Sequence, residues 1–477
     1  MTLGTATSPP LSLLRQAAWS SAATATGLLA SLGVIAIATR QLTQEELGSY
    51  YLALLAMTIG SGVADLGLRN SAVARLAAPQ DDARTTGRFI WTVGTVSATV
   101  VALAAAIVWK RIAPSTGTKS SVLIGVLVLG NSLMLNAGAI QVALNRVREV
   151  SASLALTELF RFGLSALALR NGLGADGLIA AIAMARLVGI GLIFRSEPSL
   201  AVPVFRARGA RDALRLSVPI YLHSLVSLAT FRYADGLLAR LLGPAGLSVY
   251  ATAMQFPALL QRAFDSIRPV VLRHVATNSA KGRDGSIDSV RLLAAILSIA
   301  ASTGILFGPP VFRIAFSAKF ADSVPVLRIL LAWSSVSLTN YYFVTSLTGR
   351  GEGRSVLAYS LPQLLLMVPV CWLLVPRWGA IGAAAAMLVT SVAGNLLGSS
   401  LVSAGIRSAG RLVWASGRSI IGVLAILVFS FTEQFPDWTA LLAFALLVGW
   451  LLMCGAFSPG ELRALVRIVS RCRQAAR

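Results

Sequence analysis

Histidine, cysteine and acidic residues are scarce in this 477-residue chain. It holds two histidines, three cysteines, and 19 Asp and Glu against 41 Lys and Arg. Cys371, Cys454 and Cys472 are too scattered for a metal site or a disulfide framework. His223 and His274 lie far apart, which argues against a zinc site or a catalytic triad. We therefore predict that the protein is not an enzyme, with no catalytic residues, no metal and no cofactor.

Charge of either sign is also low for a soluble protein. Only 13% of the residues are charged, whereas soluble domains have about 25%, and 56% are hydrophobic, with a mean hydropathy of +0.75. A net charge of +22 suggests nucleic acid in a soluble protein. Here no Lys/Arg-rich arm interleaved with aromatics occurs, and membrane proteins collect basic residues in their cytoplasmic loops. We expect no nucleic-acid binding.

Apolar runs of roughly 20 residues recur along the whole chain, each long enough to cross about 30 Å of hydrocarbon. They predict an all-α polytopic membrane protein of about fourteen transmembrane helices. The first six are expected at 17–39, 49–68, 89–109, 121–143, 151–169 and 176–194. The next six are expected at 217–239, 247–267, 291–312, 324–348, 355–375 and 379–402, followed by a pair at 413–431 and 438–457.

The distribution of Lys and Arg predicts the orientation of these helices. One set of alternate loops, with both termini, holds 27 of them, and the opposite set holds nine. Since basic residues mark the cytoplasmic side, both termini are predicted to be cytoplasmic. The longest loop has about 22 residues, which leaves no room for a catalytic domain outside the bilayer.

Two stretches 200 residues apart resemble each other, TRQLTQEELGSY at 39–50 and ARLLGPAGLSVY at 239–250. Weaker echoes join 144–154 to 347–357 and 176–185 to 378–387. Chance alignment of apolar helices is the alternative explanation. The echoes coincide with the helix count, however, and predict a parallel repeat of two six-helix lobes around a central cleft.

The identical residues of the first echo fall at equivalent places in the two lobes. They are Arg40 and Arg240, Leu42 and Leu242, Leu47 and Leu247, Tyr50 and Tyr250, Ala53 and Ala253, and Asp65 and Asp265. The predicted organisation is an N-terminal lobe at 1–210, a C-terminal lobe at 211–403, and two additional helices with a basic tail at 404–477.

Several stretches resemble the polysaccharide-transporter branch of the multidrug/oligosaccharidyl-lipid/polysaccharide (MOP) exporter superfamily. They include ATRQLTQEELGSYYLALLAMTIGSGVADLGLRNSAVARLA, LSVPIYLHSLVSLATFRYADGLLARLLGPAGLSVYATAMQF, FADSVPVLRILLAWSSVSLTNYYFVTSLTGRGEGRSVLAYS and VPRWGAIGAAAAMLV. The resemblance spans about residues 12–403. It implies two six-helix lobes that flip lipid-linked oligosaccharides across a bacterial cytoplasmic membrane, with a polysaccharide polymerase and chain-length machinery as candidate partners.

Ionisable residues inside the predicted helices are the candidate site residues, because a charge in hydrocarbon needs a partner or a wet cavity. The candidate substrate-binding cations are Arg186, Arg161, Arg262 and Arg232. The candidate coupling or structural acids are Glu158, Asp235, Asp65 and Asp265. Guanidinium groups suit phosphate oxygens, so an excess of mid-membrane arginine favours an isoprenoid-pyrophosphate-linked glycan over the cationic substrates of drug exporters.

Each candidate also has a structural explanation. Glu158 and Arg161 are spaced i,i+3 and can neutralise each other on one helix face. The same spacing joins Arg232 to Asp235 and Arg262 to Asp265. Asp65 and Asp265 can also pair with nearby arginines at the inner surface, and Arg328 can extend towards the outer headgroups.

Arg186 has no acidic residue nearby in the sequence, so it is the first choice for a cation that lines a cavity. On the same evidence Arg186 and Arg328 are expected to remain unmatched by acids.

Three other functions stay open from sequence. They are a cation-coupled small-molecule or multidrug exporter of the same fold, a peptidoglycan-precursor flippase, and an integral-membrane glycan polymerase. The polymerase is disfavoured because the predicted outer loops are too short to carry catalytic residues.

Overall fold

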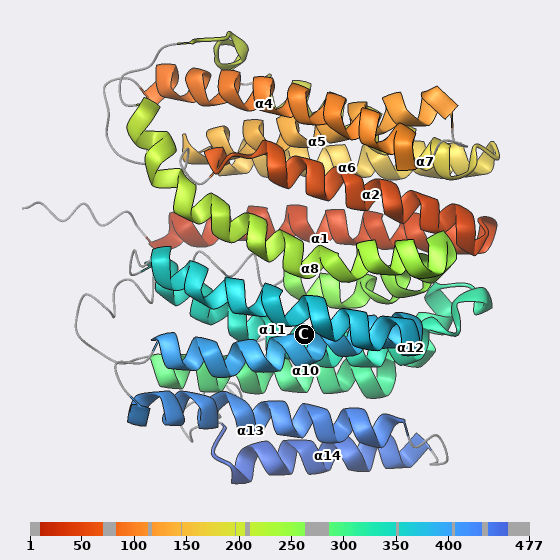
Figure 1. Ribbon diagram of the computed structural model, residues 1–477, viewed down its shortest axis with the longest axis vertical. Helices are drawn as coiled ribbons and strands as arrows, with labels where there is room; N and C mark the ends of the chain where they lie inside the picture. Colours follow the sequence, from red (N-terminus) through yellow and green to blue (C-terminus); the bar gives the residue numbers. More distant parts are fainter. Residues whose placement is uncertain are drawn as a thin grey trace, which may run out of the picture. The chain divides into compact units, whose positions relative to one another are not determined.

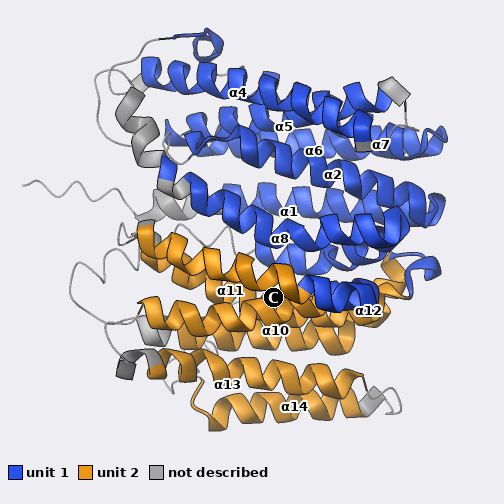
Figure 2. Cartoon of the chain, in the orientation of Figure 1, with its two compact units in different colours: residues 1–267, 316–321, 371–383 blue, residues 268–315, 322–370, 384–477 orange. Residues whose placement is uncertain are grey.

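The computed structural model describes residues 10–69, 83–112, 117–144, 146–195, 197–205, 210–262, 286–349, 353–402, 406–431 and 437–456. Every regular element within these residues is helical. The chain forms two compact units (Figure 2). Unit 1 comprises residues 1–267, 316–321 and 371–383, and unit 2 comprises 268–315, 322–370 and 384–477. The lobe boundaries predicted at 210 and 403 stay a prediction, because a division into compact units does not show where one copy of a repeat ends and the next begins.

The helices of unit 1 lie side by side along a common direction (Figure 1). They are α1 (Pro10–Gln41), α2 (Gln44–Ala64), α4 (Ala83–Ile112), α5 (Gly117–Ala143), α6 (Val147–Arg170), α7 (Gly174–Phe194) and α8 (Ala210–Ala253), with short 3-10 turns η2 (Pro198–Ala201) and η3 (Ala318–Phe320). Unit 2 contains α10 (Ser286–Ala315), α11 (Ser323–Gly349), α13 (Ile406–Ser430) and α14 (Asp437–Met453). The long α12 (Gly353–Val402) contributes residues to both units.

The predicted polytopic helical fold is confirmed. Among the described residues, nine helices are long and apolar enough to cross a membrane, and Tyr221–Ala253 with Gln255–Arg262 passes the same test as a pair bent by 43°. Val100, Leu103 and Ile107 of α4 are each about 60% exposed. Since residues at this spacing share one side of a helix, they form an apolar stripe suited to lipid.

Two glycines divide elements that the sequence predicts as separate helices. Gly243 has φ +68° inside α8, and Gly379 has φ +55° inside α12. Only glycine adopts such angles without a steric penalty, and each position falls at or beside a predicted interhelical turn. The chain bends by 43° at the break between Ala253 and Gln255, close to Pro257, whose nitrogen cannot donate a helical hydrogen bond.

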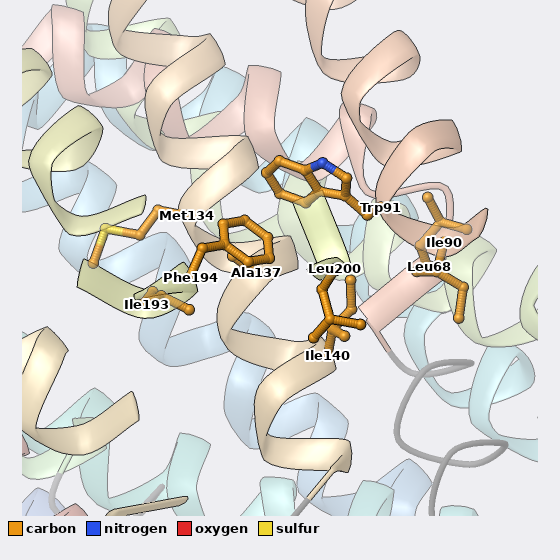
Figure 3. Close-up of a cluster of buried hydrophobic side chains, with 9 residues drawn as sticks. All are labelled: Leu68, Ile90, Trp91, Met134, Ala137, Ile140, Ile193, Phe194 and Leu200. Carbon is orange, nitrogen blue, oxygen red and sulfur yellow. The ribbon is translucent and has the colours of Figure 1, made fainter. Parts of the chain in front are cut away.

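Nine buried apolar residues hold α4, α5, α7 and η2 of unit 1 together (Figure 3). Trp91 and Phe194 meet edge to face, with ring centroids 4.6 Å apart. Leu200 carries η2 into the same cluster and is fully buried. The cluster therefore anchors the connection after α7 to the helices beside it.

An ion pair holds the start of that connection. Arg146, before α6, donates from Nη2 to Glu197 Oε2 at 2.6 Å, and Ser199 Oγ donates to Glu197 Oε1 at 2.8 Å. The hydrogen bonds from Ser199 and Arg146 lower the pKa of the Glu197 carboxyl from its usual value. The pair ties the turn between α5 and α6 to the end of α7.

The two repeated stretches contact each other within unit 1. Helices α2 and α8 pack together, and a Cβ placed on Gly48 would collide with the Pro244 carbonyl. The Tyr51 hydroxyl lies 3.3 Å from Thr252 Oγ1. Three of the identical residue pairs are buried alike: Leu47 with Leu247, Tyr50 with Tyr250 and Ala53 with Ala253. These equivalent positions are therefore buried alike, and the parallel repeat stays a prediction.

Unit 2 contains a buried network of hydroxyl and amide groups. Asn340 of α11 donates to the Ser391 carbonyl of α12 at 2.6 Å, and Ser298 of α10 donates to the Ser419 carbonyl of α13 at 3.2 Å. Ser416 donates to the Asn395 side chain at 2.8 Å. Such contacts hold helices together in hydrocarbon, where the hydrophobic effect between helices is absent.

Candidate functional site

A cavity of about 230 Å³ lies within unit 1 among α1, α2, α6, α7, α8 and the short helix Gln255–Arg262. The charged side chains that line it are Glu158, Arg161, Arg186, Arg232, Asp235 and Arg262. The structure thus brings together all four candidate cations and two of the four candidate acids. They come from four elements of the chain, α6, α7, α8 and the short helix Gln255–Arg262.

Glu158 is the centre of the charged cluster. Its Oε1 accepts a hydrogen bond from Arg186 Nη1 of α7 at 3.0 Å, and its Oε2 lies 2.8 Å from Arg161 Nε, one turn later on α6. The Arg161 contact is an ion pair only, because its Nε–H does not meet the geometry of a hydrogen bond. Arg262 also interacts electrostatically with Glu158. One carboxylate therefore contacts two guanidinium groups, and Arg262 lines the same cavity.

The expectation that Arg186 is unmatched is wrong. Its acidic partner is Glu158, 28 residues earlier in the chain and on the neighbouring helix, so sequence spacing could not reveal the pair. The expected pairing of Glu158 with Arg161 is present, but Glu158 is shared with Arg186. Arg328 is also engaged in unit 2: its Nη1 donates to the Ser430 carbonyl at 2.6 Å, and its guanidinium lies 5.9 Å from the centre of the Phe431 ring.

A second charged pair lies on α8. Arg232 Nη1 is 3.0 Å from Asp235 Oδ2, at the predicted i,i+3 spacing. Asp235 is buried and Arg232 is more than one-third exposed, so the guanidinium is the more accessible partner.

Among the described lining residues, four guanidinium groups face two carboxylates. The formal charges of these described lining residues therefore sum to +2.

Tyrosine hydroxyls add neutral hydrogen-bonding groups that the sequence did not indicate as site residues. Tyr50, Tyr51 and Tyr250 all line the cavity and are buried. The Tyr250 hydroxyl has no hydrogen-bond partner among the described residues. The one available sequence signal was that Tyr50 and Tyr250 are equivalent in the repeat, which identified a packing position and not a cavity.

The remaining candidate acids lie elsewhere. Asp65 lies 2.7 Å from Arg69 Nε, as the structural explanation predicts, and both line a separate hollow of about 220 Å³ in unit 1. Asp265 falls outside the described residues, so its pairing with Arg262 stays a prediction. Among the described residues no cluster of three or more His, Cys, Asp or Glu side chains could hold a metal ion.

The chemistry of the cavity suits an anion with several oxygen atoms. Guanidinium groups donate paired hydrogen bonds to phosphate or carboxylate oxygens, and the tyrosine hydroxyls can donate or accept. The two carboxylates hold Arg161, Arg186 and Arg232 at fixed positions.

Comparison with known proteins agrees with this membrane architecture. A family model described as polysaccharide biosynthesis protein matches residues 13–272, more than half of the chain. A search of the curated proteins found no match.

Among solved structures, the chain is similar to the lipid II flippase MurJ in an inward closed conformation. The identity is 15% over 95% of this chain and 100% of that chain, with a TM-score of 0.68. It is also similar to a eukaryotic MATE transporter, at 16% identity over 86% and 99% of the chains and a TM-score of 0.59. A MOP superfamily transporter from Pyrococcus furiosus is 13% identical over 86% and 96%, with a TM-score of 0.59. These similarities show a shared transporter fold.

Proposed function

The chain belongs to the polysaccharide biosynthesis protein family, and from that premise we propose that it flips a lipid-linked oligosaccharide across a bacterial cytoplasmic membrane. The substrate is an isoprenoid-pyrophosphate glycan that moves from the cytoplasmic to the outer leaflet by alternating access. Its product supplies the assembly of exopolysaccharide, O-antigen or capsule. Both termini lie in the cytoplasm, and a polysaccharide polymerase with its chain-length machinery takes the glycan on the outer side.

The observation that supports this proposal is the excess of guanidinium over carboxylate in the unit 1 cavity. A pyrophosphate carries its negative charge at the junction of lipid and sugar. Arg186 and Arg161 both contact the single carboxylate of Glu158, so two guanidinium groups share one negative charge at the cavity wall. A diphosphate group would supply the missing negative charge, and its oxygens match the forked geometry of arginine.

A related substrate is the second candidate. One similar structure is a lipid II flippase, and a peptidoglycan precursor would present a comparable diphosphate to the same arginines. A cation-coupled multidrug exporter of the same fold is the third candidate, since MATE transporters are also similar. Its cationic substrates would be repelled by the arginines that line the cavity, which favours the anionic substrates.

Transport by the purified protein tests the proposal. The protein is reconstituted in liposomes with a fluorescent isoprenoid-pyrophosphate oligosaccharide, a fluorescent peptidoglycan precursor or a fluorescent organic cation. Movement between leaflets is followed by the loss of fluorescence when a membrane-impermeant quencher is added. We expect flipping of the oligosaccharide carrier, and transport of the organic cation alone would contradict the proposal.

Deletion of the protein gives an independent test in cells. Glycan synthesis should continue, and the lipid-linked glycan should accumulate on the cytoplasmic leaflet. Labelled carrier that reaches the outer face at the normal rate in the deletion strain would exclude the flippase function.

A further inference from the structure

A second group of arginines lies in unit 2 and shares no residue with the charged cavity of unit 1. A hollow of about 670 Å³ is lined by Arg291 of α10, by Arg411, Trp414 and Arg418 of α13, and by Gly455 just after α14. No acidic residue is among its described lining residues. The guanidinium groups of Arg411 and Arg418 therefore border an open space with no carboxylate among its described lining residues.

The spacing on α13 explains why these side chains meet. Arg411, Trp414 and Arg418 are separated by three and four residues, so they lie on one side of the helix. Arg411 is exposed and makes no ion pair with any described acid. Trp414 is 62% exposed. The guanidinium of Arg411 and the indole ring of Trp414, which carries an N–H donor, therefore lie next to each other at the rim of the hollow.

Arg418 is held deeper in the hollow by α14. Its Nη1 donates to the Cys454 carbonyl, and the Trp450 indole donates to the Arg418 carbonyl at 3.1 Å. Gly455, with φ +65°, turns the chain where α14 ends. Arg418 is 7% exposed, and its Nε is buried without a hydrogen-bond partner among the described residues. Since a guanidinium has five N–H donors, capping α14 leaves several of them for a ligand.

Three helices meet here: α10 near its start, α13 in its first half and α14 at its end. The distribution of basic residues predicts that all three of these parts lie at the cytoplasmic face. Tryptophan favours the depth of the headgroups, and basic pockets between transmembrane helices on this side bind anionic headgroups.

We propose that this hollow binds the headgroup of an anionic phospholipid of the inner leaflet. Arg411 and Arg418 contact the phosphate, and Trp414 lies against the glycerol and the upper acyl chain. The site is separate from the cavity assigned to the transported glycan, and it does not depend on what that cavity carries.

Lipid binding to the full-length protein in a neutral detergent tests this assignment. Dioctanoyl phosphatidylglycerol and dioctanoyl phosphatidylcholine are titrated separately, and bound molecules are counted by native mass spectrometry. We expect tighter binding of phosphatidylglycerol. Arg411→Gln should weaken it roughly fivefold, since a basic residue near a membrane surface attracts an anionic lipid by about that factor. Arg411 is exposed, so the substitution is not expected to disturb folding.

Arg313→Gln is the matched control, because it removes an exposed arginine from the other end of α10. It should leave the affinity for phosphatidylglycerol unchanged. Equal weakening by both substitutions would mean a general effect of net charge and would overturn the assignment. Equal affinity for the two lipids would overturn it as well. Inorganic phosphate that displaces the lipid at equal concentration would show a site for a free anion and not for a lipid headgroup.

Discussion

Replacing Arg186 by alanine tests the charged cavity most directly. Its guanidinium donates to Glu158 at 3.0 Å from α7 and is 17% exposed, so a ligand in the cavity can reach it. The substitution leaves Glu158 beside Arg161 at 2.8 Å, so the carboxylate keeps a cationic partner. Alanine also keeps the Cβ that packs closely against Gly130 of α5. We therefore expect Arg186→Ala to insert in the membrane and to fold.

The expected loss follows from one missing charge-assisted contact. Such contacts contribute about 1.5–3 kcal/mol each, so transport should fall by roughly one to two orders of magnitude. Arg186→Lys should restore only part of the activity, because lysine keeps the charge and loses the planar fork that matches a phosphate. The ranking wild type, lysine, alanine would indicate a contact that depends on geometry as well as on charge.

The assay is flipping of a fluorescent isoprenoid-pyrophosphate oligosaccharide in liposomes, normalised to the amount of inserted protein. Arg69→Ala is the matched control, because Arg69 forms a 2.7 Å ion pair with Asp65 in unit 1 but lines a different hollow. We expect the control to flip at close to the wild-type rate. A purely structural role for Arg186 predicts lower abundance with unchanged activity per molecule.

Arg186→Ala with the wild-type rate would remove Arg186 as the phosphate contact. Wild-type rates in Arg161→Ala and Arg262→Ala as well would refute the argument from the cationic cavity.

Three further predictions concern packing, pH and topology. Gly48→Ala should destabilise the protein by about 1–3 kcal/mol through its collision with Pro244. Gly163→Ala is the control, because a Cβ at Gly163 would meet nothing within 4 Å. Equal thermal unfolding midpoints for the two variants would contradict this prediction. The lowered pKa of Glu197 means that its stabilising contribution is present above the unfolded pKa of about 4.3 and is lost as the pH falls through the lower folded value. Glu197→Gln should therefore lower the unfolding midpoint at pH 7, and the difference should shrink below pH about 4. A reporter fused after Pro436 should be external, and a cytoplasmic signal would mean that the last two helices do not form a hairpin.

The predicted elements agree with the structure where a single helix carries its own signal. The run predicted at 176–194 corresponds to α7 at Gly174–Phe194, and the run predicted at 151–169 corresponds to α6 at Val147–Arg170. Both are long apolar runs that end at charged or glycine-rich turns. The expected pair of Arg232 and Asp235 also forms, because i,i+3 neighbours on a helix meet whatever the surrounding fold.

The error at Arg186 has a definite cause. Its acidic partner was sought along its own helix, but α7 packs against α6, and Glu158 approaches from that neighbour. The tyrosines of the cavity were missed for a related reason. Tyr50 and Tyr250 were recognised as repeat positions, yet only the packing of α2 against α8 brings them to one cavity.

The sequence by itself determined the helical membrane architecture, the breaks near Gly243 and Gly379, and the residues whose charge inside the bilayer needed an explanation. Hydrophobic length and backbone freedom are local properties, so they can be inferred from a chain without its neighbours. Only the tertiary structure decided that two arginines share Glu158 and that four arginines line one cavity. Those contacts depend on which helix faces pack together, and that choice is made by the whole set of interhelical contacts and not by any one segment.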